Sequence, residues 1–450
     1  MSPAITPADG MEIRADTVLA PGVHLLPRGL RVMADGVTLS GPGALLVGAG
    51  RQGTGVQIHG RRGVTVRDLA LREYHHGIRA GECQSLALER LDISCTAETP
   101  PDTIFLDIWR GAADAYGGAI LLDRVADSAV SECVLMHQQN GLLTYRCSRV
   151  AVTRTRADYC SGWGFHLDGT CDSRFEECSA DYCCRFEPRE GGRHHGHMGA
   201  DAAGFLAVRG SSRNVFRRCK ARMGGDGFFL AGLAPDGTKC GCDDNLFEEN
   251  DGSLSPNIAF EATFCRGNVF RGNYADRSNY GYWLGFSWDT LIEGGRMVMN
   301  RQAGIAVENG HGITVRGCQF QGNGHGILLW SRHVEQFARL FPESLASHDW
   351  TIEQCVFTRN GKGIRIAADQ DHGIRPLPEA ESGRSETRPR RHAIRGCDIQ
   401  DNRVGIELVN ADETVVEDCI LNRNVEANLR QDDCRGSVIR CCLGAAGGYL

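Results

Sequence analysis

The sequence lacks the segments that would place a protein in a membrane or direct it out of the cell. No apolar run approaches about 18 residues, which excludes a transmembrane helix of ordinary length. The first residues, MSPAITPADGMEIRAD, contain neither a basic segment nor an apolar core, and therefore do not resemble a signal peptide. These absences predict no membrane partner and a cytoplasmic protein, or a secreted or periplasmic one if a leader precedes this sequence.

A basic stripe is also missing. The net charge is −7, and 49 Lys and Arg are interspersed with 56 Asp and Glu. A nucleic-acid surface needs clustered positive charge, so nucleic acid is not an expected partner. Lysine is scarce, which argues against a polysaccharide lyase that abstracts an acidic C5 proton with a Lys or Arg but does not exclude one.

Glycine is abundant, with 57 residues, and it marks a repeated phrase. A small anchor residue is followed by Ile, Leu or Phe and then by alternating residues, as in AGIAVE at Gly304 and VGIELV at Gly405. The anchors are spaced by 22–23 residues or by longer steps that contain insertions, and they are Gly77, Gly118, Gly141, Gly164, Gly204, Gly227, Ala259, Gly281, Gly304, Gly326, Gly363, Gly405 and Ala427. This period is typical of a solenoid in which each repeat is one coil.

Each coil is too short for a helix followed by a strand. The alternation after each anchor predicts one strand, and a second strand is expected about twelve residues earlier, with Gly, Asn and Asp turns between them. The predicted fold is all-β: a single right-handed parallel β-helix with coils of 22–23 residues. Residues 1–60 are expected to form the N-terminal cap and first coils, and residues 61–450 the rest. Long insertions, expected to follow anchor strands at similar places, lie near 96–115, 187–203, 233–244, 331–348 (a short helix) and 368–391.

Twenty cysteines recur at fixed coil positions. Several lie eight residues before an anchor, where Asn273 lies in another coil: Cys133, Cys219, Cys318, Cys355, Cys397 and Cys419. Thiols in one coil position stack into a column, so we interpret them as buried structural residues. Pairing of some cysteines, and metal binding by two of His194, His195 and His197 together with Asp201, stay open as alternatives, and no metal or other cofactor is assigned.

Residues two and four positions after each anchor should point outward. They form a stripe of aromatic, apolar and isolated acidic residues, which favours a ligand groove on one face. Glu261 and Glu308 lie two coils apart with Trp283 between them. Two carboxyls separated by about 6.5–9.5 Å suit an inverting glycosidase. The alternative is that both glutamates bind loops or arginines.

The chain resembles right-handed parallel β-helix repeat proteins of the pectate-lyase-like and NosD-like group over residues 17–443. The phrases GGDGFFL, NIAFEATF, YGYWLGFS and GIAVENGH resemble a bacterial branch of unsettled activity. This resemblance implies functional roles for Asp226, Glu261 and Glu308, whereas Asn309 stands where the branch has a histidine. The wider fold includes hydrolases, lyases, epimerases and binding proteins, so the fold alone does not select a reaction.

The leading hypothesis is a carbohydrate-active enzyme, a glycoside hydrolase acting on an oligosaccharide or polysaccharide. Glu261, Glu308 and Asp226 are the candidate catalytic residues, and the candidate substrate-binding residues are Trp283, Trp330, His166, Asp168, Asp201 and Arg365. One alternative is a lyase or epimerase on uronic-acid sugars, which would need Arg365 or a divalent cation. Another is a non-catalytic glycan-binding or NosD-like accessory protein. A monomer or a homotrimer is compatible with the sequence.

Overall fold

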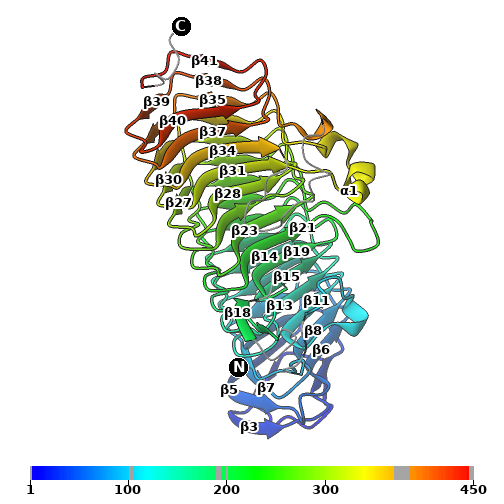
Figure 1. The fold of residues 1–450 in the computed structure, drawn as a ribbon. Helices are drawn as coiled ribbons and strands as arrows, with labels where there is room; N and C mark the ends of the chain where they lie inside the picture. The colour runs from blue at the N-terminus through cyan, green and yellow to red at the C-terminus, as the bar shows by residue number, and fades with distance from the viewer. Residues whose placement is uncertain are drawn as a thin grey trace. The chain divides into compact units, whose positions relative to one another are not determined.

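A computed structural model describes residues 3–100, 103, 105–188, 194–198, 201–368 and 385–444, with backbone alone at 186–188, 194–198 and 385. The chain divides into unit 1, Met1–Phe229, and unit 2, Leu230–Leu450. In Figure 1, unit 1 runs from blue to green and unit 2 from green to red. No helix among the described residues is long and apolar enough to cross a membrane.

Unit 1 is a stack of β-coils whose strands pair in parallel with the next coil. Its first sheet contains one strand per coil: β1 (Glu12–Ile13), β4 (Leu30–Val32), β6 (Thr54–His59), β8 (His76–Gly81), β11 (Gly118–Asp123), β13 (Leu142–Tyr145), β15 (Phe165–Asp168) and β19 (Ala203–Val208), with β21 (Asp226–Ala231) crossing the division between the units. Its second sheet contains β2 (Thr17–Val18), β3 (Gly22–Leu25), β5 (Thr38–Val47), β7 (Thr65–Arg72), β9 (Ala87–Glu89), β10 (Asp92–Ser94), β12 (Ala126–Ser131), β14 (Ser148–Thr153), β16 (Arg174–Glu176) and β20 (Val215–Arg217).

Unit 2 repeats the same plan and adds a third strand to most coils. Its first sheet contains β23 (Ile258–Thr263), β25 (Tyr280–Trp283), β28 (Ala303–Glu308), β31 (His325–Ser331), β34 (Lys362–Ala368), β37 (Val404–Val409) and β40 (Ala427–Asp432). The second contains β22 (Leu246–Glu248), β24 (Val269–Arg271), β26 (Leu291–Glu293), β29 (Thr314–Arg316), β32 (Thr351–Glu353), β35 (Ala393–Arg395), β38 (Val415–Glu417) and β41 (Val438–Arg440). The third, which the sequence did not predict, contains β27 (Arg296–Val298), β30 (Gln319–Gln321), β33 (Val356–Thr358), β36 (Asp398–Gln400) and β39 (Ile420–Asn422).

The interior of each unit is filled by residues that stack from coil to coil. In unit 1, Phe205 stacks between Phe165 and Phe228, with ring centroids 4.6 and 4.8 Å away. In unit 2, Phe320 and Phe357 stack at 4.5 Å. Phe165, Phe205 and Phe228 occupy the inward position directly after the anchor that the alternation predicted, whereas Phe320 and Phe357 lie on β30 and β33 of the third sheet. Both stacks form because parallel in-register strands place equivalent side chains one coil above the other.

Polar ladders complete the turns. All twenty cysteines are free thiols, and the six that lie before anchors are buried, as the column interpretation expected. A buried asparagine ladder runs through Asn323, Asn360 and Asn402, in which each side-chain oxygen accepts the backbone N–H of the preceding member at 2.9 Å. Such bonds satisfy backbone groups that the turns bury.

Strand register corrects two anchors. Ile120 pairs with Ile78 and with Leu142, so Ala119 is the equivalent of Gly77 and Gly118 lies one residue before it. Val404 pairs with Ala427, which makes Asn428 the last anchor. At both places a small residue also stands next to the true anchor, and the sequence pattern alone could not separate the two.

The insertions leave the coil at two places rather than one. Residues 95–117 follow β10 and precede an anchor strand, and they contain the short 3-10 turn η1 (Ala112–Asp114). The insertion near 187–203 also precedes an anchor strand, and its β17 (Phe186–Pro188) pairs antiparallel with β18 (His194–Met198). Insertions near 233–244, 331–348 and 368–391 follow anchor strands, as expected, although residues 369–384 lie outside the described chain.

The helix expected within 331–348 is confirmed. It is α1 (Glu335–Leu340), followed by the 3-10 turn η2 (Pro342–Ser344). Phe337 makes edge contacts with Phe264 and Phe286, both at 4.9 Å, and Phe341 lies 5.1 Å from Phe264. These rings fix the insertion to the coils of unit 2. A further 3-10 turn, η4 (Ser385–Thr387), lies near the end of the last insertion.

Candidate functional site

Three columns of residues point away from the interior of the first sheet in each unit. They lie one residue before the anchor, two after it and four after it. In unit 2 they form a cluster of their own, separate from the stacked interior: Ile258, Tyr280, Ala303, Ala306, Leu328 and Trp330, with Trp283 beside it. The column before the anchor was not expected, because strict alternation would turn it inward. The anchor residue itself faces inward, so alternation is broken between it and the residue that follows. At Gly304, for example, a Cβ would lie 2.8 Å from the interior residue Phe320.

Much of the expected outward stripe is buried rather than exposed. Leu206 and Val208 in unit 1 and Ala306 and Trp330 in unit 2 are 0% exposed, and Leu328 is 6% exposed. The prediction of an open aromatic and apolar groove along these positions is therefore wrong. In unit 1, residues such as Leu106 and Ala112 of the 95–117 insertion are buried with this face.

An acidic column lies on the outer face of unit 1, four residues after the anchors. Asp123 on β11 pairs in direct register with Tyr145 on β13, and Tyr145 pairs with Asp168 on β15. Two coil steps of about 4.8 Å place the Cα atoms of the two aspartates about 9.6 Å apart, with no offset along the strands. Tyr145 thus lies on the coil between two carboxyl groups that are two coils apart.

Asp168 is buried beside an arginine. Its Oδ2 lies 3.2 Å from Nε of Arg209, and its side chain is 8% exposed. Burial raises the pKa of Asp168 to about 6 and outweighs the opposing effects of Arg209 and Arg146. The carboxyl group therefore carries a proton for part of the time near neutral pH, which is the state that a general acid requires.

Asp123 has a different environment. Its Oδ1 accepts a hydrogen bond from Nη2 of Arg146 at 2.6 Å, and its Oδ2 lies 3.6 Å from Nη2 of Arg124. Its side chain is 16% exposed, about twice as much as that of Asp168. Asp123 is thus contacted by two arginines and is more accessible to water than Asp168.

Tyr145 and His166 form the floor between these acids. Tyr145 is 2% exposed, and burial followed by the charge of Asp168 raises the pKa of its hydroxyl group. His166 lies 5.4 Å from Tyr145, stacks on Trp163 at 4.5 Å, and places Nε2 3.3 Å from the carbonyl of Ile108. Burial lowers the pKa of His166 to about 4, so its imidazole is neutral and enclosed.

A cavity of about 290 Å³ lies beside this floor in unit 1. Its lining is mostly apolar and aromatic, with one buried carboxyl group, and comprises Phe105, Leu106, Asp107, Ile108, Trp109, Asp201 and Phe229. Asp201 Oδ2 accepts the backbone N–H of Leu106 at 2.5 Å and also contacts Arg185. Burial raises the pKa of Asp201. Arg209 joins the cavity to the acidic column, because its guanidinium donates to the carbonyl of Trp109.

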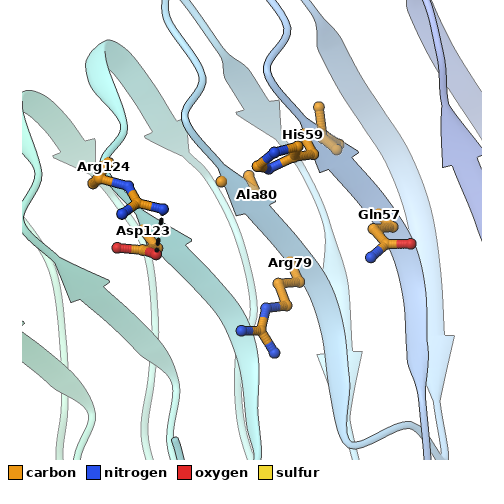
Figure 2. A pocket seen from close by; sticks show the side chains of 8 residues that line it. Gln57, His59, Arg79, Ala80, Asp123 and Arg124 are labelled. Carbon is orange, nitrogen blue, oxygen red and sulfur yellow. Dashed lines mark ion pairs between the residues drawn. The ribbon is translucent and has the colours of Figure 1, made fainter. Parts of the chain in front are cut away.

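A second cavity, of about 200 Å³, opens at the other end of the acidic column (Figure 2). It is lined by Gln57, Ile58, His59, Arg79, Ala80, Gly81, Asp123 and Arg124. Figure 2 shows Gln57, His59 and Arg79 on two neighbouring strands, with Asp123 and Arg124 on a third. Asp123 therefore belongs to both the cavity and the acidic column.

The predicted acidic pair of unit 2 lies on adjoining columns. Glu261 is in register with Trp283, which is in register with Ala306, two residues before Glu308. The two Cα atoms are about 12 Å apart from two coil steps and two strand residues. Glu308 is 4% exposed and accepts a hydrogen bond from Nε of Arg332 at 2.6 Å, while Glu261 is 9% exposed.

The two predicted sugar-stacking residues of unit 2 contact one another. Trp283 meets Trp330 edge to face, with ring centroids 5.3 Å apart. Trp283 is half-buried, whereas Trp330 has no exposed surface. In this arrangement Trp283 can meet a ligand, and Trp330 supports it from below.

Arg365 lies in a charged cluster farther along unit 2. Its Nε is 3.2 Å from Oε2 of Glu407, the same oxygen that Lys362 contacts, and Arg430 lies 3.2 Å from the other oxygen. Burial alone would raise the pKa of Glu407, but Lys362 and Arg365 lower it. Burial lowers the pKa of Lys362. Arg365 is thus committed to a buried ion pair.

Asp226 is the first residue of β21 and has no exposed surface. Its backbone N–H donates to the carbonyl of Ala202 at 3.0 Å. Among the described side chains, no group of three or more His, Cys, Asp or Glu residues is placed to hold a metal ion. The side chains of His194, His195 and His197 lie outside that part of the chain.

The sequence matches the model for the right handed beta helix region over residues 54–255 and 236–335, which together span more than half of the chain. The chain therefore belongs to this family, and its fold is a right-handed parallel β-helix. No curated protein has a sequence that matches this chain.

Solved structures of β-helix enzymes are similar to this chain in fold. The A-module of a mannuronan C-5 epimerase from Azotobacter vinelandii is 13% identical, with 95% of this chain and 91% of that chain covered and a TM-score of 0.42. A periplasmic alginate epimerase is 11% identical, with 79% and 81% covered and a TM-score of 0.44. The catalytic domain of an α-1,3-glucanase is 10% identical, with 97% and 71% covered and a TM-score of 0.40. At these identities the similarity concerns the fold alone.

Proposed function

We propose that this protein is a carbohydrate-active enzyme, a glycoside hydrolase that binds an oligosaccharide or polysaccharide along the outer face of unit 1. The observation that carries the proposal is the in-register column Asp123, Tyr145 and Asp168. It presents two carboxyl groups across an aromatic residue, and burial raises the pKa of one of them, Asp168, to about 6, which suits the general acid in hydrolysis of a glycosidic bond.

In the proposed reaction Asp168 is the general acid and Asp123 the general base. Asp168 gives its proton to the leaving glycosidic oxygen as the bond from that oxygen to the anomeric carbon breaks. Asp123 accepts a proton from the water whose oxygen bonds to the anomeric carbon on the opposite side. Side chains that start about 9.6 Å apart can bring their carboxyl groups within the roughly 6.5–9.5 Å that leaves room for this water, so the anomeric configuration would be inverted.

Neighbouring groups suit these roles. Arg146 holds the carboxyl group of Asp123 in place, and the raised pKa of Tyr145 keeps its hydroxyl group protonated and able to donate a hydrogen bond. Trp109 and Phe105 line the adjoining cavity together with Asp107 and Asp201, a combination of ring faces and carboxyl groups that fits a sugar residue. In this proposal His166 supports the floor. Asp168, which the sequence predicted as a substrate-binding residue, is instead the general acid.

Glu261, Glu308 and Asp226 remain a second candidate set for the same reaction. Trp283 favours sugar contact there because part of its ring is accessible. Glu308 is held by Arg332, and this ion pair has to open before the carboxyl group can act as an acid or a base. Arginines also contact the acids of the unit 1 column, Asp123 through Arg146 and Asp168 through Arg209. Those two acids stand in direct register, whereas Glu261 and Glu308 are offset by two residues along the strand, and for that reason we rank the unit 1 column first.

The test is product release from a glycan panel by four matched variants: Asp123→Asn, Asp168→Asn, Glu261→Gln and Glu308→Gln. We expect the first two to lose about 10²–10⁴-fold in kcat/KM and the last two to stay within about tenfold of wild type. With Asp168 as the acid, kcat/KM of wild type should also fall as pH rises above about 6.

The opposite pattern, with activity lost in the glutamate variants alone, would move the reaction to unit 2. Unsaturated products that absorb ultraviolet light would identify a lyase, and a change of sugar configuration without cleavage an epimerase. Glycan binding without any product would identify a binding protein and refute the catalytic assignment.

A further inference from the structure

The cavity in Figure 2 has a glycine at its floor where both neighbouring coils carry a side chain. Gly81 pairs in register with His59 on one side and with Asp123 on the other. A Cβ at Gly81 would lie 3.1 Å from Nδ1 of His59 and 3.9 Å from the carbonyl oxygen of Asp123. The missing side chain therefore leaves a hollow between a histidine and an aspartate (Figure 2).

Arg79 supplies positive charge to the wall of this hollow. Its Nη2 donates a hydrogen bond to the backbone carbonyl of Ala112 at 3.2 Å, and within the described chain Arg79 makes no ion pair with a carboxylate. Gln57 is in direct register with Arg79 on the neighbouring strand and is exposed. A half-buried guanidinium without an acidic partner beside an open hollow is suited to an anionic ligand.

The acids near the hollow already have cationic partners. Asp123 accepts a hydrogen bond from Arg146 at 2.6 Å, and Glu82 lies 2.6 Å from Nη2 of Arg124. Among the described residues that line the hollow, Arg79 is therefore the cation without an acidic partner. An anionic group in the hollow would meet donors from Arg79 and Gln57 without displacing an existing ion pair.

We propose that this hollow is a binding subsite for an acidic group of the saccharide, either a carboxylate or a sulfate, carried by a sugar one or two residues from the bond that is cleaved. The inference rests on the proposed function and narrows its substrate to acidic saccharides. A cavity of about 200 Å³ accepts one sugar residue at most, so the subsite binds a single acidic sugar beside Asp123.

The test is calorimetric binding to protein carrying Asp168→Asn, in which turnover does not interfere. The probes are oligogalacturonate and its methyl ester, in which each carboxylate is replaced by a neutral ester carrying one methyl group, and a sulfated and an unsulfated galactan oligosaccharide. We expect an acidic probe to bind at least about tenfold more tightly than its neutral partner, and higher salt to reduce that difference. Which acidic probe binds distinguishes carboxylate from sulfate.

Two further substitutions locate the binding. Arg79→Gln removes the charge and keeps the length of the side chain, and Gly81→Val fills the hollow at a position whose backbone accepts a side chain. Each should weaken binding of the acidic probe by about tenfold or more and leave the neutral probe unchanged. Arg154→Gln is the matched control, because Arg154 pairs with Glu132 and does not line the cavity.

Equal binding of acidic and neutral probes, no binding of either acidic probe, or full binding by the Arg79→Gln protein would each overturn the inference. These outcomes are separate from the test of catalysis. Selective acidic binding that depends on Arg79 supports the subsite even if no glycan is cleaved, and cleavage of neutral glycans alone supports the hydrolase and refutes the acidic substrate.

Discussion

Asp168 should destabilise the protein at neutral pH. Its pKa is about 6 in the folded protein, above the ordinary 3.8, because burial disfavours the charged form. Between these values the folded state binds more protons than the unfolded chain, so stability falls as pH rises from about 4 to about 6 and stays low above that. Asp168→Asn stays neutral and should raise the free energy of unfolding at pH 7.5 by up to about 3 kcal/mol, with little effect near pH 4.

Urea unfolding of wild type and variant at the two pH values measures this difference. Asp172→Asn is the control, because the pKa of Asp172 is lowered by Arg213 and its side chain is 43% exposed. An exposed ion pair contributes little, so this variant should gain no stability at pH 7.5. Equal stability of wild type and Asp168→Asn at pH 7.5 would contradict the raised pKa and weaken the case for an acid at this position.

The sequence pattern predicted some residues of this site and missed others. His166, Asp168 and Asp201 were predicted as ligand contacts, and they do lie around one floor and its adjoining cavity. Asp123 was missed because the sequence pattern placed the anchor of its coil at Gly118. Counted from Gly118, Asp123 does not fall on an outward position, whereas counted from Ala119 it does. A one-residue slip reverses every side chain of a strand, and only the pairing of Ile120 with Ile78 resolves it.

At the scale of elements, α1 should depend on its aromatic contact with the coils. Phe341 is 2% exposed and packs against Phe264, and Lys239 lies 4.5 Å above its ring. Phe341→Ala removes a buried aromatic side chain, which costs about 3–5 kcal/mol where the site cannot collapse. We expect faster hydrogen exchange of the α1 amides, because an isolated helix of this length is not stable in water.

Hydrogen exchange followed by mass spectrometry measures this effect, with Gln336→Ala on the exposed side of α1 as the control. Protection of the β28 and β31 amides should stay unchanged, since their hydrogen bonds run between coils. Unaltered exchange in α1 of the Phe341→Ala protein would mean that other contacts hold the helix.

The elements were more predictable than the surfaces they form. Local alternation predicts where strands form. The spacing of Phe, Asn and Cys residues indicates which side chains stack, so the coils and their ladders could be predicted from the sequence. Exposure depends on where a long insertion folds back. No local pattern indicated that Leu206, Ala306 and Trp330 would be covered, which is why the stripe was expected to be open.

At the scale of the whole molecule, a coil contacts its immediate neighbours and little else, so stability is a sum of local terms. Asn360 shows how local those terms are. Its side chain accepts two hydrogen bonds from Asn323, both at 2.9 Å, and donates to Phe320 and Asn402. Asn360→Ala removes these bonds from a buried turn and should cost about 3 kcal/mol or more.

This loss should stay within unit 2, to which all four residues belong. In Asn360→Ala we expect faster hydrogen exchange in β33, β34 and β36 and an earlier first unfolding transition, while affinity for the acidic probe in unit 1 remains within about twofold of wild type. Asn422→Ala, an exposed asparagine on β39, is the control. Uniformly faster exchange in both units, with a parallel loss of probe binding, would show that the coils unfold as one cooperative body and that the site in unit 1 depends on every ladder in the chain.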